Sequence, residues 1–214
     1  MADPFRVAVL ASGGGSNLGA LLDAGPGAAW SVVLVASNNA GAGALRRARA
    51  CDVATAVIAD PADGAALTRL LREARADLVV LAGYLKLVPA DSVEAFRGRI
   101  INVHPALLPA FGGPGMYGAR VHQAVLDAGM AVTGATVHEV TEAYDRGRIV
   151  AQWPVPVLPG DTVDVLAARV LAVEHQLLPA VVSAAARAGR VVRLTPRESG
   201  SPDPGMVDLV AAED

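Results

Sequence analysis

Asn102 and His104 stand two positions apart at the end of an apolar segment, directly before Pro105. If this segment is a β-strand, both side chains project from one face while Val103 enters the core. In open α/β sheets the ligand crevice lies at the carboxyl ends of the strands. An amide and an imidazole there can hold and protonate an oxyanion, and the alternative is a pair of hydrogen-bonded loop residues without a catalytic role.

Asp145 is a third candidate, in a turn that follows the segment Thr133–His138. A carboxylate beside an imidazole stabilises the charged ring and raises its pKa, as a general acid near neutral pH requires. The sequence alone leaves open whether Asp145 meets His104 or is a solvated turn residue. His138 is equally open, because a lone histidine on a strand is usually structural.

A glycine-rich run, Ser12–Asn17, separates the first apolar segment from a stretch of helical composition. Inward-turned backbone N–H groups and a following helix N-terminus can bind a phosphate there, and Ser16 and Asn17 could add donors. The run is not a Walker loop, and Leu18 stands where a dinucleotide fingerprint needs its third glycine. A tight turn without a ligand is the alternative.

Short apolar segments of the kind that form strands buried on both faces position these candidates. Five of them precede the long loop: Val7–Leu10, Val32–Ala36, Ala54–Ile58, Leu78–Ala82 and Ile100–Val103. Stretches of helical composition alternate with them: Leu18–Asp23, Gly43–Cys51, Gly64–Arg75 and Asp91–Phe96. The alternation predicts an α/β fold, a Rossmann-like open sheet, mostly parallel in its N-terminal half, with helices on both faces.

The second half of the chain begins with a glycine- and proline-rich stretch, His104–Gly118, which is long enough to be a functional loop. A helix over Val121–Ala128 and antiparallel strands over Thr133–Val140 and Ile149–Val157 are predicted next.

A last helix is predicted from Val163 toward Ala188, where Asp161-Thr162 can cap it and Pro179 should kink or divide it. We predict one domain over residues 1–194, followed by a polar and loosely ordered tail over residues 195–214.

The composition limits the classes of function. A formal net charge of −3, from 18 basic and 21 acidic side chains, gives no electrostatic reason to bind nucleic acid. The single cysteine, Cys51, suits a reducing compartment. The N-terminus does not look like an export signal, and no uninterrupted apolar run reaches the roughly 18 residues of a membrane span. We predict a cytoplasmic protein without a membrane span or a metal, since four histidines lack the spacing of a zinc site: His104, His122, His138 and His175.

Four motifs together resemble the phosphoribosylglycinamide formyltransferase family, and the likeness covers residues 6 to 194: Ser12–Asn17, Leu81–Val88, Ile101–Pro109 and Thr133–His138. The pattern Asn-x-His-Pro-x-Leu-Leu-Pro is typical of folate formyl transferases and hydrolases as a group. Gly-x-Gly-Ser-Asn narrows the likeness to the glycinamide enzymes.

The resemblance implies transfer of the formyl group of 10-formyltetrahydrofolate to the amine of phosphoribosylglycinamide in purine synthesis, through a tetrahedral oxyanion intermediate. These two small molecules are the expected partners, and a homodimer is left open. Asn102, protonated His104 and Asp145 would be catalytic, with Asp145 tuning His104. Glu174 would contact the ribose and three residues the phosphate: Gly15, Ser16 and Asn17. The folate would lie against Asn102 and two backbone stretches, Leu85, Lys86, Leu87 and Val88, and Thr141, Glu142, Ala143, Tyr144 and Asp145.

Some positions depart from the family's commonest pattern. Lys86 replaces a usual arginine, Leu171 replaces a polar ribose or phosphate contact, and the loop Phe111–Gly118 is longer than usual. These departures predict altered edge contacts and an unchanged reaction. A side chain at Gly15 is expected to close the phosphate cradle. The rivals are a formyltetrahydrofolate hydrolase and a methionyl-tRNA formyltransferase, each with an extra domain for which this chain is expected to have no room, and a non-catalytic nucleotide-binding module.

Overall fold

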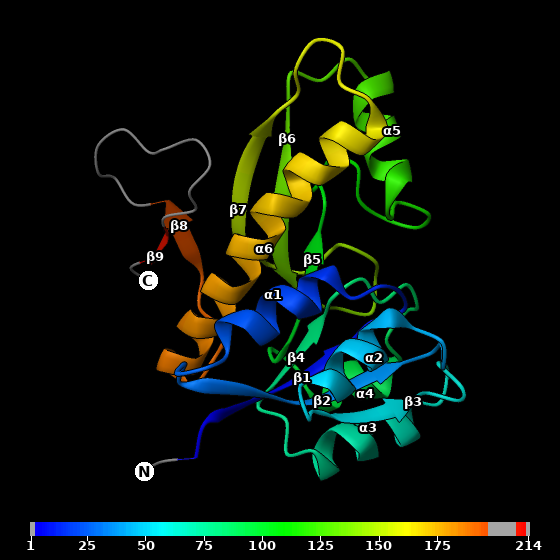
Figure 1. Ribbon diagram of the computed structural model, residues 1–214, viewed down its shortest axis with the longest axis vertical. Coiled ribbons are helices and arrows are strands. Elements are labelled where there is room, and N and C mark those ends of the chain that lie inside the picture. Colours follow the sequence, from blue (N-terminus) through cyan, green and yellow to red (C-terminus); the bar gives the residue numbers. More distant parts are fainter. Residues whose placement is uncertain (1–2, 197–208, 213–214) are drawn as a thin grey trace.

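The computed structural model describes residues 3–196 and 209–212, which form a central sheet of seven strands in the order β3-β2-β1-β4-β5-β6-β7 (Figure 1). Its strands are β1 (Phe5–Leu10), β2 (Trp30–Ser37), β3 (Ala54–Val57), β4 (Leu78–Leu81), β5 (Ile100–His104), β6 (Val132–Glu139) and β7 (Ile149–Pro156). Strands β1 to β5 pair in parallel, whereas β6 is antiparallel to both β5 and β7. The predicted fold class is therefore confirmed.

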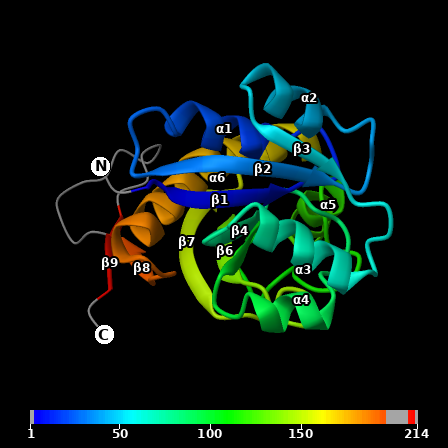
Figure 2. The ribbon, with the colours of Figure 1, turned by 90° about the horizontal axis from the view of Figure 1, so that it is seen from below.

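Helices cover both faces of the sheet because its strands are apolar on both faces. Val7 and Val9 of β1 enter one core, and Ala8 and Leu10 enter the other. The first core takes side chains from α1 (Ser16–Ala24), α2 (Gly43–Ala50), α5 (Ala119–Asp127) and α6 (Val163–Ala188). The second takes them from α3 (Gly64–Glu73) and α4 (Ala90–Ala95), which lie across the sheet from α1 in Figure 2.

The antiparallel strand β6 brings a second set of polar residues to the end of β5. Asn102 faces His138 across the two strands, and His104 faces Thr136. The register between β6 and β7 shifts at His138, and such irregularities re-aim side chains near functional sites.

A single helix of 26 residues, α6, crosses the first face of the sheet. Thr162 Oγ1 accepts a hydrogen bond from Val165 N at 3.3 Å and caps its start. Pro179 lies inside this helix and does not divide it, contrary to one of the two expectations. By length and hydropathy α6 could cross a membrane, but ten of its residues are buried within the fold, which accounts for its apolar composition.

Two short strands follow α6. Leu194–Pro196 (β8) pairs antiparallel with Leu209–Ala211 (β9), and Leu194 is buried in the first core. These segments are ordered strands, which differs from the loosely ordered tail expected after residue 194. The residues between them, 197–208, lie outside the described part of the chain.

Candidate active site

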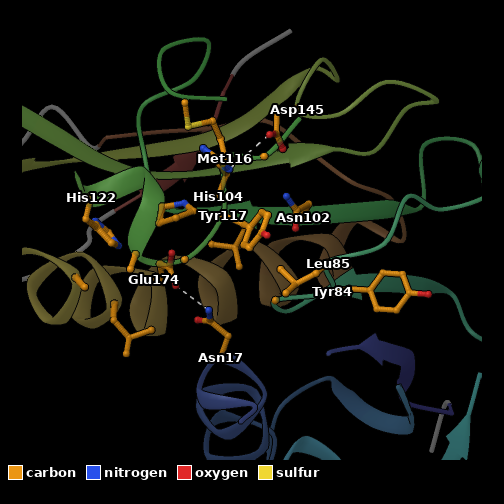
Figure 3. A pocket seen from close by; sticks show the side chains of 18 of the residues that line it. Asn17, Tyr84, Leu85, Asn102, His104, Met116, Tyr117, His122, Asp145 and Glu174 are labelled. Atoms are coloured by element: carbon orange, nitrogen blue, oxygen red, sulfur yellow. Dashed lines mark hydrogen bonds and ion pairs between the residues drawn. The ribbon is translucent and has the colours of Figure 1, made fainter. Parts of the chain in front are cut away.

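A cavity of about 500 Å³ opens at the carboxyl ends of β4 and β5. Its walls are the first turn of α1, the segment after β4, residues 113–118, the first turn of α5 and one face of α6. Figure 3 shows the side chains of Asn102, His104, Glu174 and Asn17 gathered around it. The sheet thus places the predicted crevice at the carboxyl ends of its strands.

Four side chains from β5, β6 and the β6–β7 turn form one polar cluster. His104 Nδ1 lies 3.7 Å from Asp145 Oδ2, and His138 Nε2 lies 3.4 Å from Asp145 Oδ1. Asn102 Nδ2 lies 3.1 Å from His138 Nε2. The fold therefore brings Asp145 beside His104, which the sequence alone left open.

Burial and charge oppose each other in this cluster. Burial lowers the pKa of His104, while Asp145 and the Phe111 carbonyl act to raise it. Burial alone would raise the pKa of Asp145, but hydrogen bonds from His138 and Gly113 and the nearby imidazoles together lower it. Asp145 is therefore a carboxylate at neutral pH. Burial therefore outweighs Asp145 in setting the pKa of His104, and protonation of this ring during the reaction stays a prediction.

The loop of residues 111–118 is tied to the cluster by its backbone. His104 Nε2–H donates to the carbonyl oxygen of Phe111 at 2.8 Å, and Gly113 N–H donates to Asp145 Oδ2 at 2.8 Å. The loop therefore occupies one hydrogen-bonding site on each partner of the His104–Asp145 pair.

Gly112 makes this close approach possible. A Cβ atom at that position would lie 2.5 Å from Leu108 Cδ2 and 3.1 Å from the Cβ atom of Asp145. Asp145 itself has a φ of 54°, in the left-handed region that aspartate tolerates better than most residues. A side chain at position 112 would therefore require Leu108 to move.

Thr136 fixes the chain that leaves β5. Its hydroxyl donates to the Ala106 carbonyl at 2.6 Å and accepts hydrogen bonds from Leu108 N at 3.1 Å and Gln152 Nε2 at 2.9 Å. Because Thr136 faces His104 in the register, these bonds hold the segment after His104 against β6.

Gly15 has a structural role that the sequence did not indicate. Its φ is +75°, and a Cβ atom there would lie 2.8 Å from Ala44 Cα in α2. A side chain at Gly15 would therefore collide with α2, and the expectation that it would also close a phosphate cradle stays a prediction. Ser16 and Asn17 border the cavity, whereas Gly15 does not.

Asn17 and Glu174, which are 157 positions apart, meet at the bottom of the cavity. Asn17 Nδ2 donates to Glu174 Oε2 at 2.7 Å, and both residues are buried. Burial raises the pKa of Glu174 to about 7, and the hydrogen bond from Asn17 opposes this shift. Asn17 Oδ1 is buried without a hydrogen-bond partner among the described residues. The pair can accept hydrogen bonds from the hydroxyl groups of a ligand and can donate hydrogen bonds to them.

Ser12 joins the glycine run to the segment after β4. Its hydroxyl donates to Asn38 Oδ1 at 2.6 Å and accepts from Leu85 N at 2.9 Å. The expected phosphate loop and the expected folate segment therefore share one anchor.

A second, narrow cavity of about 50 Å³ adjoins the first. Most of the expected folate residues border it: Lys86, Leu87, Val88, Asn102, Thr141, Ala143, Tyr144 and Asp145. Leu85 borders the larger cavity instead, and Glu142 borders neither. Asn102, Tyr144 and Asp145 border both, so the polar cluster lies where the two cavities meet.

Two histidines at the site received no role from the sequence. His138 contacts both Asn102 and Asp145, and the strand register could have indicated it. His122 borders the larger cavity from α5, and no motif pointed to it. Leu171 also borders this cavity and brings only carbon atoms to it. Within residues 3–196 and 209–212, no three His, Cys, Asp or Glu side chains are grouped to hold a metal ion.

Comparison with known proteins gives one consistent result. The family model described as formyl transferase matches residues 5–182. The chloroplastic phosphoribosylglycinamide formyltransferase of Arabidopsis thaliana is 43% identical over 206 residues, which are 92% of this chain and 69% of the plant protein. The phosphoribosylglycinamide formyltransferase of Mycobacterium tuberculosis is 41% identical over 201 residues, which are 88% of each chain.

A solved structure agrees with these sequence matches. Glycinamide ribonucleotide transformylase 1 from Symbiobacterium toebii superposes with a TM-score of 0.81 at 39% identity, over 91% of this chain and 92% of that one. The chain therefore belongs to the formyl transferase family, and within it to the phosphoribosylglycinamide formyltransferases.

Proposed function

We propose that this chain transfers the formyl group of 10-formyltetrahydrofolate to the amine of phosphoribosylglycinamide, through an oxyanion intermediate that Asn102 and His104 stabilise. Formyl transfer in purine synthesis follows from the family, whose members use a formyl-folate as co-substrate. One observation carries the finer proposal. Contacts of 3.1 to 3.7 Å join Asn102, His138, Asp145 and His104 where the two cavities meet.

Asn102 is the first proposed donor to the oxyanion. His138 Nδ1 lies 2.8 Å from the Glu139 carbonyl, which can only accept, so this nitrogen carries a proton. His138 Nε2 lies 3.1 Å from Asn102 Nδ2 and 3.4 Å from Asp145 Oδ1, so the imidazole joins the amide to the carboxylate. This contact fixes the orientation of the Asn102 amide, which can donate an N–H to the substrate oxygen. Preorganised donors of this kind are commonly the largest contribution to acyl transfer.

His104 is the second proposed donor. Its Nε2–H donates to the Phe111 carbonyl in the free protein, and a substrate oxygen can replace that carbonyl. Protonation at Nδ1 faces Asp145, so the charged ring would have an acceptor for each N–H. Asp145 thus supports the imidazolium that the oxyanion needs, against the effect of burial.

Proton transfer completes the reaction. The attacking amine must lose a proton, and the leaving nitrogen of the folate must gain one. The charged His104 ring can deliver its proton to the leaving folate nitrogen, and the neutral ring that results can take the proton of the attacking amine, which restores the imidazolium beside Asp145.

The remaining site residues are proposed to hold the substrates. Ser16, Asn17 and the first turn of α1 would bind the phosphate, with Gly15 shaping that turn, and Glu174 would bind the ribose. The folate would approach through the narrower cavity, against Lys86 to Val88 and Thr141 to Asp145. The expected partners are these small molecules alone.

Location and assembly stay proposals of the same kind. Cys51 is an exposed free thiol, which suits a reducing compartment such as the cytoplasm. Whether the protein forms a homodimer can be measured by analytical ultracentrifugation.

The direct test supplies the purified protein with both substrates and follows tetrahydrofolate and the N-formyl product together. We expect equal amounts of both, and no turnover without the amine. Asn102→Ala and His104→Ala should each lower kcat by about 10²- to 10³-fold with little change in the KM of the amine. Gln123→Ala, an exposed change on α5, is the control.

Three results would contradict the proposal. Release of formate without the amine would indicate a hydrolase. Formylation of methionyl-tRNA in place of the glycinamide would indicate a methionyl-tRNA formyltransferase. Near-normal kcat in either alanine variant would remove the proposed oxyanion donors.

A further inference from the structure

The larger cavity has few positive charges for a site that would receive a phosphorylated substrate. Its walls contain the carboxyl groups of Asp145, Asp164 and Glu174, and neither a lysine nor an arginine among the residues that border it. The basic side chains of the walls are His104 and His122. A phosphate dianion must therefore find its partners among imidazole and backbone N–H groups.

His122 has the free hydrogen-bonding capacity that His104 lacks. His104 already donates to Phe111 and faces Asp145. His122 is only 5% exposed, and its Nδ1 is buried without a hydrogen-bond partner among the described residues. A buried polar nitrogen without a partner is unfavourable in a fold, which points to a bound ligand as its partner.

The helix that carries His122 also presents its N-terminus to the cavity. Gly118 precedes α5, no side chain caps this end, and the first turn has no acidic residue. The first N–H groups of such a helix lack intrahelical partners and carry partial positive charge. Gly118 and Ala119 border the cavity together with His122. In Figure 3, His104 lies between His122 and Asn102.

We propose that His122 and the uncapped first turn of α5 bind the phosphate of the amine substrate, together with the first turn of α1. The inference rests on the proposed function, because it presupposes a phosphorylated amine. It adds a second helix N-terminus and an imidazole to a phosphate site that the glycine run alone had suggested. His122 then binds the substrate and takes no part in the chemical step.

The charges around His122 give this proposal a second readout. Burial and the neighbouring His104 of β5 lower the pKa of His122, so the ring is mainly neutral in the free protein. Asp164 and Glu174 of α6 border the same cavity. A bound dianion favours the charged ring, so substrate binding should take up a proton at His122 near neutral pH.

The experiment compares His122→Ala and His122→Gln with Gln123→Ala, the neighbouring exposed position on the same helix. Each protein is assayed with the phosphorylated amine and with the same compound lacking its phosphate. Both His122 variants should raise the KM of the phosphorylated amine by about 10- to 100-fold, the range for a lost hydrogen bond to a charged group. We expect kcat, the KM of the folate and the KM of the unphosphorylated amine to change less than about 3-fold.

Binding of inorganic phosphate, measured by calorimetry in two buffers of different ionisation enthalpy, tests the site without catalysis. Phosphate affinity and proton uptake should both fall in His122→Gln relative to the wild type. Unchanged phosphate affinity, equal KM losses on both amines, or a fall in kcat alone would each overturn the inference. A wild-type protein that binds phosphate through His122 but transfers no formyl group would contradict only the proposed function.

Discussion

Asp145→Asn separates the charge of Asp145 from its shape. The asparagine keeps an oxygen that can accept from Gly113 N–H, and it removes the negative charge that faces His104. Asp145 Oδ2 lies 3.7 Å from His104 Nδ1, and the two side chains are 10% and 4% exposed. A charge pair at this distance is worth about 4 kcal/mol at an effective dielectric constant of about 20, which limits the loss of imidazolium to about 10³-fold. We expect kcat at neutral pH to fall by about 10²- to 10³-fold.

The pH dependence gives the sign of the effect. Asp145 raises the pKa of His104, so its neutral replacement lets burial lower that pKa further. The charged ring is present below its pKa, and the decline of kcat on the alkaline side should therefore move to lower pH in the variant. The substrate amine titrates in the opposite sense, because it must be neutral to attack. Measuring kcat at saturation with both substrates restricts the profile to groups of the bound complex.

A matched substitution controls for the lost carboxylate. Asp161 forms an ion pair with Arg169 at 2.6 Å at the start of α6, away from the polar cluster. Asp161→Asn should keep the wild-type kcat and pH profile. A wild-type kcat and pH profile in Asp145→Asn would indicate that Asp145 has only a structural role in its turn. A reduced rate with an unmoved alkaline limb would refute the charge argument.

Three further expectations concern residues in and beside the site. Gly15→Val should lower the Tm by several degrees, because its Cβ would lie 2.8 Å from Ala44 Cα. Gly13→Ala, whose Cβ would lie in open space, should leave the Tm unchanged, and equal Tm values for the two variants would contradict this packing. Burial raises the pKa of Glu174 to about 7, so the free energy of unfolding should fall by roughly 3 kcal/mol as the pH rises from 4.5 through 7. Urea titrations of Glu174→Gln should show a smaller fall, and an identical one would place the titration elsewhere. His138→Ala should lower kcat about 10-fold by freeing the Asn102 amide, and a larger change in the KM of the amine than in kcat would argue against that role.

The sheet could be predicted because the apolar pattern of each strand is visible in a few neighbouring residues. Segments such as Val7–Leu10 are apolar at every position, since alternate side chains enter two different cores. The common face of Asn102 and His104 follows from the same alternation. The ordered strand β9 was missed because a polar, glycine- and proline-rich context gave no periodic signal for Leu209–Ala211.

The assembly of the site depends on contacts that no local pattern contains. Asp145 reaches His104 because β6 returns beside β5, and Gly113 N–H then ties the loop to the turn. Glu174 meets Asn17 across 157 positions, and only the family likeness pointed to it. The charge state of His104 depends on the depth of its burial, which emerges once both sides of the cavity are built.

The Ser12 hydroxyl connects the segments that are proposed to bind the two substrates. One hydroxyl accepts from Leu85 on the proposed folate side and donates to Asn38 beside the glycine run. A displacement of either segment on binding its substrate must stretch or tighten a bond to the same oxygen. If this shared oxygen links the two affinities, thermodynamic reciprocity requires each substrate to change the other's dissociation constant by the same factor.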